Sequence, residues 1–177
     1  MAKYRRYRKY SRRGRSRWLS NLVDIPAATA SLSNVGGYNY VEQILITNPE
    51  YANTFTSSLY TIKNVEVTLQ FDATLNNSVG IENIQFYIMY IPQDMQLTED
   101  YPIKHPEFIM AMRYYGEPGQ DTTTAAKYSP SIKIKTRLAR KLHAGDRVSL
   151  FIRAFNTSGN PVMLDYGGLC RFWTKSN

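Results

Sequence analysis

Hydrophobic and polar positions alternate along several stretches of this chain. In residues 65–71 the apolar side chains Val65, Val67, Leu69 and Phe71 are separated by polar ones. Successive side chains of an extended strand point to opposite faces, so this spacing puts the four apolar groups on one face. Residues 132–135 repeat the alternation, and residues 148–153 follow it less regularly. The pattern predicts strands with one buried face.

One stretch departs from the alternation because it is apolar on both faces. Residues 84–91, IQFYIMYI, contain a single side chain that is strongly polar. Such a run is typical of a central strand that is covered on both sides or that lies at a subunit contact. The full set of predicted strands is 21–30, 38–47, 65–71, 84–91, 108–115, 132–135, 148–153 and 169–174.

Clusters of Gly, Pro, Asn and Ser separate these segments, as expected for turns between strands. Helical periodicity nowhere extends beyond one or two turns, and residues 48–59 and 103–112 are the best places for short helices. About eight short strands in some 160 residues predict an all-β fold, a single antiparallel eight-stranded β-sandwich of the jelly-roll type. Residues 18–177 form this one domain, which has the size of an ordinary domain.

Charge divides the chain into two parts. Residues 1–17, MAKYRRYRKYSRRGRSR, hold nine of the 22 basic residues and no acidic one. The rest of the chain is left with 13 basic side chains against all 14 acidic ones, so the +8 net charge is a property of the N-terminal arm. Like charges at this density repel, and the arm has too few apolar groups to form a core. We expect the free arm to be disordered.

The arm has the composition of a nucleic-acid-binding segment. Arg and Lys neutralise phosphates and release counterions, and interleaved aromatic rings stack on unpaired bases. Single-stranded nucleic acid suits this combination better than a duplex. A basic cluster also satisfies a nuclear localisation signal, and the two roles are compatible. The predicted contacts are Lys3, Tyr4, Arg5, Arg6, Tyr7, Arg8, Lys9, Tyr10, Arg12, Arg13, Arg15 and Arg17.

A second basic group lies in the body. Lys133, Lys135 and Arg137 occupy alternate positions, which predicts one strand face, with Ile132 and Ile134 on the other face. Arg140 and Lys141 follow this group in the sequence. One interpretation is a surface that continues nucleic-acid binding beyond the arm. The alternative is an ordinary solvated strand face.

Candidate catalytic chemistry is sparse, and we expect no enzyme and no cofactor. His105 and Glu107 could begin a metal or acid–base site, but a structural turn explains them without a third ligand. Asp94, Glu99 and Asp100 could bind calcium between subunits, and a solvated acidic loop is the simpler alternative.

Two further features bear on location. Cys170 is the one cysteine, so an intrachain disulfide is impossible, and its alternating surroundings predict a buried small side chain. No apolar run is long enough for a membrane-spanning helix, and residues 18–30 lack the unbroken apolar segment of a signal peptide. We expect an intracellular protein with no membrane partner.

An Arg/Tyr-rich arm followed by an all-β body resembles the capsid proteins of circoviruses and related small circular single-stranded DNA viruses. It is also similar to the shell proteins of satellite viruses such as satellite tobacco necrosis virus. The likeness spans most of the chain, and its motifs are loose patterns whose order matters more than any one of them. They are the opening seventeen residues and the segments 60–67, 87–92, 140–146 and 168–174.

The resemblance implies a jelly roll with two four-stranded sheets, of strand order BIDG and CHEF. It also implies sixty copies in a T=1 icosahedral shell, with the arms directed inward onto the genome. The partners would be further copies of the chain and a single-stranded viral genome, with an unknown host attachment factor. The location would be the virion, and the host nucleus or cytoplasm during assembly.

The kind of genome stays open. The style of the arm favours circular single-stranded DNA. Sixty arms would neutralise on the order of 540 phosphates, near the roughly 530 nucleotides that encode 177 residues, which favours a small satellite RNA. A non-viral single-strand-binding module is a further alternative, and a lectin-like sandwich conflicts with the arm.

Overall fold

The computed structural model describes residues 18–48, 59–74, 81–115, 131–157 and 159–176. The arm and most of the short helix expected within 48–59 therefore lie outside the described residues. The described elements are β1 (Leu19–Leu32), β2 (Gly37–Thr47), β3 (Tyr60–Thr74), β4 (Ile81–Ile91), α1 (Tyr101–Lys104), η1 (Pro106–Phe108), β5 (Ile109–Tyr115), β6 (Ser131–Lys135), β7 (Arg140–Leu142), β8 (Arg147–Asn156) and β9 (Val162–Ser176).

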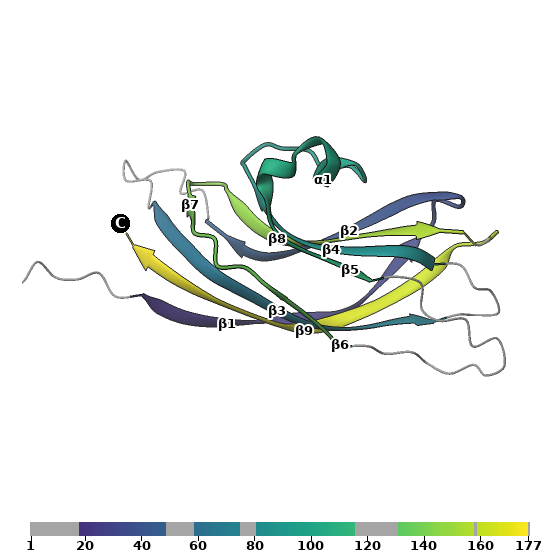
Figure 1. Cartoon of the computed structure of the whole chain (residues 1–177), viewed down its shortest axis with the longest axis horizontal. Coiled ribbons are helices and arrows are strands. Elements are labelled where there is room, and N and C mark those ends of the chain that lie inside the picture. The colour runs from purple at the N-terminus through teal and green to yellow at the C-terminus, as the bar shows by residue number, and fades with distance from the viewer. Residues whose placement is uncertain (1–17, 49–58, 75–80, 116–130, 158, 177) are drawn as a thin grey trace, which may run out of the picture.

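Two antiparallel sheets pack face to face (Figure 1). One sheet has the order β1-β9-β3-β6, with β7 also paired to β3, and the other has the order β2-β8-β4-β5. When β6 and β7 are counted as one position and the strands are lettered B to I along the chain, these orders are BIDG and CHEF. The expected jelly-roll sandwich is therefore confirmed.

The described residues contain nine strands, one more than expected, because one strand position is interrupted. Both β6 and β7 pair with β3. Between them the Thr136 amide donates to the Val65 carbonyl at 2.9 Å, and the Thr136 hydroxyl accepts from the Leu138 amide at 3.0 Å. On the same stretch of β3, the pairing with β9 shifts register between Lys63 and Glu66. A bulge in β3 thus coincides with a local turn in its neighbour, and the short β7 was missed from the sequence.

The main core lies between the two sheets and confirms the alternation. Val65, Val67, Leu69 and Phe71 of β3 are all buried, with exposed fractions of 3% or less. Ile132 and Ile134 of β6 and Cys170 of β9 point into the same core. The prediction that Cys170 is a buried small side chain is confirmed, and burial raises the pKa of its thiol to about 12.

The doubly apolar strand is covered on both faces, as expected. Ile84, Phe86 and Ile88 of β4 face the main core. The alternate side chains Tyr87, Met89 and Ile91 form a second apolar cluster with Phe151 of β8 and Tyr101 of α1. Residues 92–108, which we call the cover segment, carry α1 and η1 over this sheet (Figure 1).

A buried arginine attaches the cover segment to the sheet. The Arg153 side chain of β8 is 4% exposed and donates to the Glu99 carbonyl at 2.8 Å. It also donates to Gln85 at 3.2 Å and to the Asp100 carboxylate at 3.3 Å. Its guanidinium lies over the Tyr38 ring, 3.3 Å from the centroid. Because a buried cation needs partners, these contacts fix the position of the segment.

A turn before β8 holds the start of the cover segment. The Asp146 carboxylate is buried and accepts from the Tyr90 hydroxyl at 2.6 Å, the His143 amide at 2.8 Å and the Gln93 amide at 3.2 Å. Burial is the main cause that raises the pKa of Tyr90 to about 12, and its hydrogen bond to Asp146 acts in the same direction. Gly145 has a φ of +83°, which is the left-handed conformation that glycine adopts without strain.

The short helix expected within 103–112 is only partly correct. Helical turns occupy Tyr101–Lys104 and Pro106–Phe108, but from Ile109 onward the chain is strand β5, paired with β4. Pro106 removes a backbone donor next to His105, whose φ of −129° is not helical. The residues from Ile109 onward pair with β4 instead. The predicted strand at 108–115 is therefore correct where it overlaps the predicted helix.

Candidate nucleic-acid interface

The outward side of the β1-β9-β3-β6 sheet is a regular array of side chains set by strand register. We call it the open face, because it is rich in exposed residues. Across one row lie Leu22 of β1, Arg171 of β9, Glu66 of β3 and Lys135 of β6. Directly paired residues on one face are close enough to interact. In this row Arg171 and Lys135 therefore lie on opposite sides of the Glu66 carboxylate.

The next row on the open face adds Lys133. It runs through Asp24, Leu169, Thr68 and Lys133 on the same four strands. Lys133 and Lys135 are exposed, with Ile132 and Ile134 buried beneath, so the predicted alternation is confirmed for this strand. Arg137 is also exposed, but it lies beyond the end of β6 at Lys135.

Glu66 is shared by two ammonium groups. Its carboxylate lies 2.8 Å from Lys133 Nζ and 3.6 Å from Lys135 Nζ. The hydrogen bond from Lys133 lowers the pKa of Glu66, and the charges of Lys133, Lys135 and Arg171 act in the same direction against partial desolvation. The carboxylate is therefore ionised at neutral pH, and the group of four retains a net positive charge.

Further cations lie at the end of the open face where β1 begins. Lys141 of β7 and Lys175 of β9 both pair with Thr61 of β3, one on each side. Lys63 places its Nζ 3.9 Å from the centroid of the Trp18 ring. Trp18 is the first described residue, so it is the point at which residues 1–17 join the body. The basic arm is thus attached beside a basic end of the sheet.

Sequence reasoning missed Lys63, Arg171 and Lys175 as members of this surface. Each stands alone in its own segment, between apolar or neutral neighbours. Arg171 could have been marked as outward-facing, because it alternates with the buried Cys170 and Phe172. What the sequence could not supply is the register that places it opposite Glu66.

Four acidic residues lie together on the other side of the sandwich. Asp94, Glu99, Asp100 and Glu107 all belong to the cover segment. Asp100 accepts from Arg153, and within the described residues no group of three or more His, Cys, Asp or Glu side chains could hold a metal ion. A body with almost no net charge is therefore electrically polar, with a basic open face and an acidic cover.

His105 and Glu107 have a structural explanation. His105 Nδ1 lies 3.2 Å from a Glu107 carboxylate oxygen, and the imidazole stacks on Phe108 with ring centroids 5.6 Å apart. The pair stabilises the turn between α1 and η1. This agrees with the structural turn that was the simpler of the two interpretations from the sequence.

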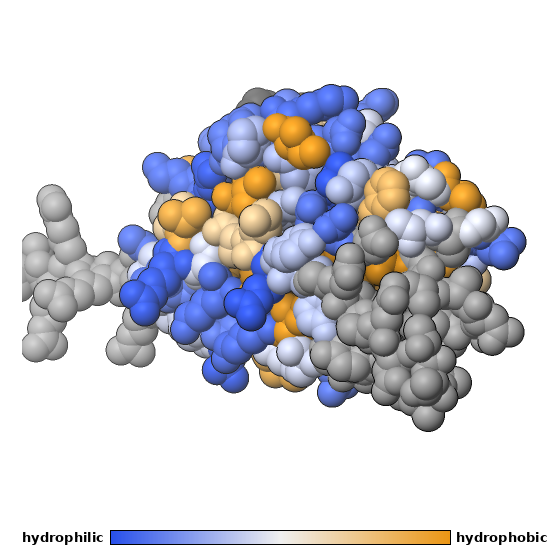
Figure 2. All heavy atoms as spheres, turned by 45° about the vertical axis from the view of Figure 1, so that its right-hand side comes forward, coloured by the Kyte–Doolittle hydropathy of each residue, from blue (hydrophilic) through white to orange (hydrophobic). Residues whose placement is uncertain are grey.

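Exposed apolar side chains occur on the edge strands. Leu19 and Leu22 lie on β1, Ile44 on β2, and Met112 and Tyr114 on β5, each at least half exposed. On the side seen in Figure 2, hydrophobic residues form several separate groups among hydrophilic ones. Tyr114 and Ile103 are exposed, whereas their neighbours Tyr101 and Pro102 are buried and Tyr115 is partly buried against the main core.

The twelve arm residues predicted to bind nucleic acid lie outside the described residues. In the part of the chain that the structure describes, no helix is long and apolar enough to cross a membrane.

Comparisons with known proteins gave structural similarity alone. No family model and no curated protein sequence matches the chain. The 60-mer crystal structure of the BFDV capsid protein has 10% sequence identity and a TM-score of 0.40, with 92% of this chain and 95% of that chain covered. The decameric form of the same protein has 9% identity and a TM-score of 0.35, covering 91% and 99%.

The VP2 subviral particle of infectious bursal disease virus is more distant. It has 11% identity and a TM-score of 0.25, covering 90% of this chain and 42% of that chain. At this level of similarity we base no function on these structures. The function of the chain therefore rests on its own residues.

Proposed function

We propose that this chain is a viral capsid protein that assembles into a small icosahedral shell and packages a single-stranded genome. One observation carries the proposal: the arm, with nine basic residues, joins the body at Trp18, beside the basic end of the open face. Arm and open face both offer cations for phosphates, and unpaired bases can stack on the tyrosines of the arm.

The electrical polarity of the body suits a shell. In a shell, the face that binds the genome must point to the interior. The acidic cover segment, on the opposite face of the sandwich, would then point to the exterior. Basic residues spread over both faces would bind nucleic acid outside the shell as well. Segregated charge therefore favours packaging over general adhesion to nucleic acid.

Self-association would use the edges of the sheets. Edge strands present unpaired backbone groups, and β1, β2 and β5 carry the exposed apolar side chains of the sandwich edges. Sixty copies in a T=1 arrangement is the proposed assembly, with circular single-stranded DNA as the proposed genome and a satellite-type RNA as the alternative. The proposed location is the virion, with the arm also acting as a nuclear localisation signal during assembly.

A non-viral single-strand-binding module remains the second candidate, and the open face favours it too. The neutral body argued against such a module, because these modules carry charge on their folded surface. The structure removes that objection, since Lys133, Lys135 and Arg171 collect on one folded face. The two functions differ in assembly, because only the capsid forms closed particles.

The test is electron microscopy of the expressed chain and of a version that lacks residues 1–17, with nuclease digestion of the co-purified nucleic acid. Uniform particles that protect nucleic acid, emptied or lost on truncation, are the expected result. The nuclease that degrades the extracted strand then identifies DNA or RNA. Monomers in every condition, with nucleic acid bound, would overturn the capsid proposal in favour of the binding module.

A further inference from the structure

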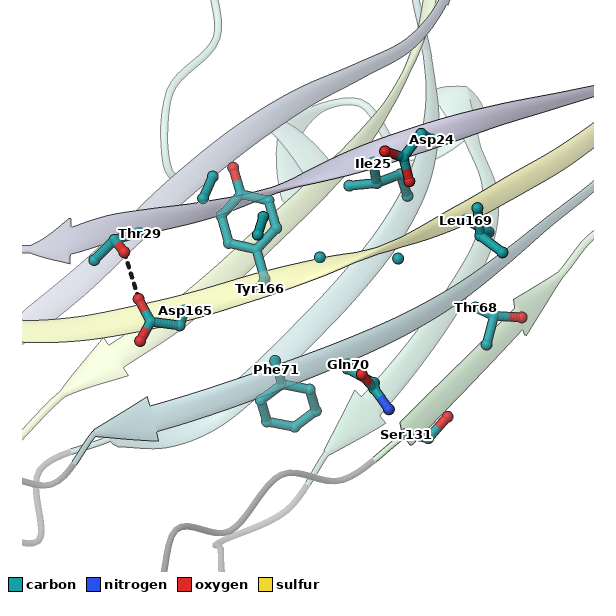
Figure 3. A pocket seen from close by; sticks show the side chains of 14 residues that line it. Asp24, Ile25, Thr29, Thr68, Gln70, Phe71, Ser131, Asp165, Tyr166 and Leu169 are labelled. Atoms are coloured by element: carbon teal, nitrogen blue, oxygen red, sulfur yellow. Dashed lines mark hydrogen bonds between the residues drawn. The ribbon is translucent and has the colours of Figure 1, made fainter.

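The open face contains a pocket beside its cationic rows. It is a depression of about 880 Å³ lined by parts of β1, β9, β3 and β6 (Figure 3). A volume in this range accommodates a small organic ligand. The pocket lies within the array of paired strands, so the frame that shapes it is rigid.

Missing side chains explain the depression. Gly167 and Gly168 lie on β9 in the middle of the sheet and form part of the lining. A Cβ on Gly168 would lie 2.1 Å from the Thr68 carbonyl oxygen, so a close approach of β9 to β3 requires glycine here. On the other side, β1 shifts register against β9 between Ile25 and Ala28. The floor is consequently exposed backbone.

Polar groups surround this floor. Thr68 and Gln70 of β3 and Ser131 of β6 lie along one side, as Figure 3 shows. Two carboxylates also line the pocket, Asp24 of β1 and Asp165 of β9, and Asp165 accepts a hydrogen bond from the Thr29 hydroxyl. Gln70 can both donate and accept hydrogen bonds, the hydroxyls can do the same, and the carboxylates accept only. A lining that combines apolar groups with hydrogen-bond donors and acceptors suits a heteroaromatic ring.

Lys133 stands at the end of a row whose other members line the pocket, and Lys135 and Arg171 stand in the next row. Lys133 pairs with Thr68, and it follows Ser131 by two residues, about 7 Å along the strand. Arg171 follows Leu169, another lining residue, by the same spacing on β9. A phosphate held by Lys133 or Arg171 therefore lies within the span of one nucleotide from the pocket.

We propose that this pocket binds an unpaired base of single-stranded nucleic acid whose adjoining phosphates contact Lys133, Lys135 and Arg171. The inference rests on the proposed binding of single strands and adds a defined base site on the folded body. A nucleotide matches both parts of this site, because its phosphates can contact the neighbouring cations while N–H groups of its base can donate to the Asp24 and Asp165 carboxylates in the lining.

The test measures the contribution of bases separately from that of phosphates. Full-length protein is mixed with labelled oligothymidylate or with an abasic strand of equal length, below the protein concentration at which particles form. We expect wild type to bind the base-bearing strand about tenfold more tightly, in the range of stacking on one or more bases. Ser131→Phe places a ring in the pocket from an exposed strand position and should reduce that preference, leaving the part that the arm tyrosines supply.

A charge variant provides the matched control. Lys133→Gln should weaken both strands by a similar factor and reduce the salt dependence, and it should leave the preference for bases intact. Ser131→Phe, in contrast, should reduce the preference for bases and leave the salt dependence nearly unchanged. Gln70→Ala, a smaller change on the rim, should reduce the preference partially and guards against misfolding of the phenylalanine variant.

Photocrosslinking supplies a direct readout. Irradiation of a bound iodouracil-containing strand should label the tryptic peptide of residues 154–171, which contains Gly167 and Gly168. A preference for bases that is undiminished in both pocket variants, or that is absent from wild type, would overturn the pocket. Failure of wild type to bind either strand would instead refute the proposed function.

Discussion

The two sheets of this sandwich share a core but differ on their outer faces. The β2-β8-β4-β5 sheet carries a second apolar cluster, buried under an acidic cover segment that Arg153 attaches. The β1-β9-β3-β6 sheet leaves its outer side chains exposed, and its cations surround one carboxylate. Under the proposed function this difference is a division of roles, with one outer face contributing to stability and the other to binding. Four changes test this division.

The largest expected effect is on stability, at the covered sheet. Phe151 has no exposed surface and stacks on Tyr40 at a centroid distance of 5.2 Å. Phe151→Ala should lower the free energy of unfolding by about 3–5 kcal/mol, because burial is reduced and a cavity forms. Urea denaturation measures it. The control Leu22→Ala truncates a side chain on the open face that is 61% exposed, and it should change the free energy of unfolding by less than about 0.5 kcal/mol. Equal decreases for the two variants would contradict the division.

The next effect concerns attachment of the cover segment. Arg153→Met removes the hydrogen bonds to Glu99, Gln85 and Asp100 and should lower the free energy of unfolding by about 2 kcal/mol. Trypsin should then cut faster after the exposed Lys104. Arg171→Met, the matched change on the open face, should alter neither quantity. Unchanged cleavage in Arg153→Met would show that other interactions hold the segment.

The third effect is on binding, at the open face. Lys133→Gln combined with Lys135→Gln should weaken oligonucleotide binding and reduce the slope of log affinity against log salt by about 0.7 for each phosphate that is no longer neutralised. Thermal unfolding should change little, because both side chains are exposed. The control pair Lys104→Gln and Arg113→Gln removes the same charge from the other sheet and its cover. Equal weakening by the two pairs would remove the distinction between the faces.

The smallest effect involves Glu66 and pH. Glu66→Gln frees both ammonium groups and should raise oligonucleotide affinity about two- to threefold, whereas Glu99→Gln on the cover should leave it unchanged. The pKa of Glu66 lies below its usual 4.5 in the folded chain. Its stabilising interaction is therefore fully present above about 4.5 and is lost as the pH falls through the lowered value. Acid titration of stability should show this component in wild type and not in Glu66→Gln.

The strand alternation could be predicted without a structure. Val65, Val67, Leu69 and Phe71 are buried as a set because a period of two depends on local geometry alone. The doubly apolar run at 84–91 likewise predicted that both faces of this strand are covered. The sequence did not show that the segment following β4 covers the outer face. The extra strand β7 was missed because three residues carry too little periodicity to register.

By itself the sequence determined the all-β class, the inward residues of the main strands and the separation of a basic arm from a nearly neutral body. These features depend on local spacing and on counts. Only the tertiary structure decided that Arg171 lies opposite Glu66 and beside Lys133 and Lys135, and that glycines on β9 open a pocket next to them. Register between strands far apart in the chain is set by packing of the whole sandwich, so no single segment contains it.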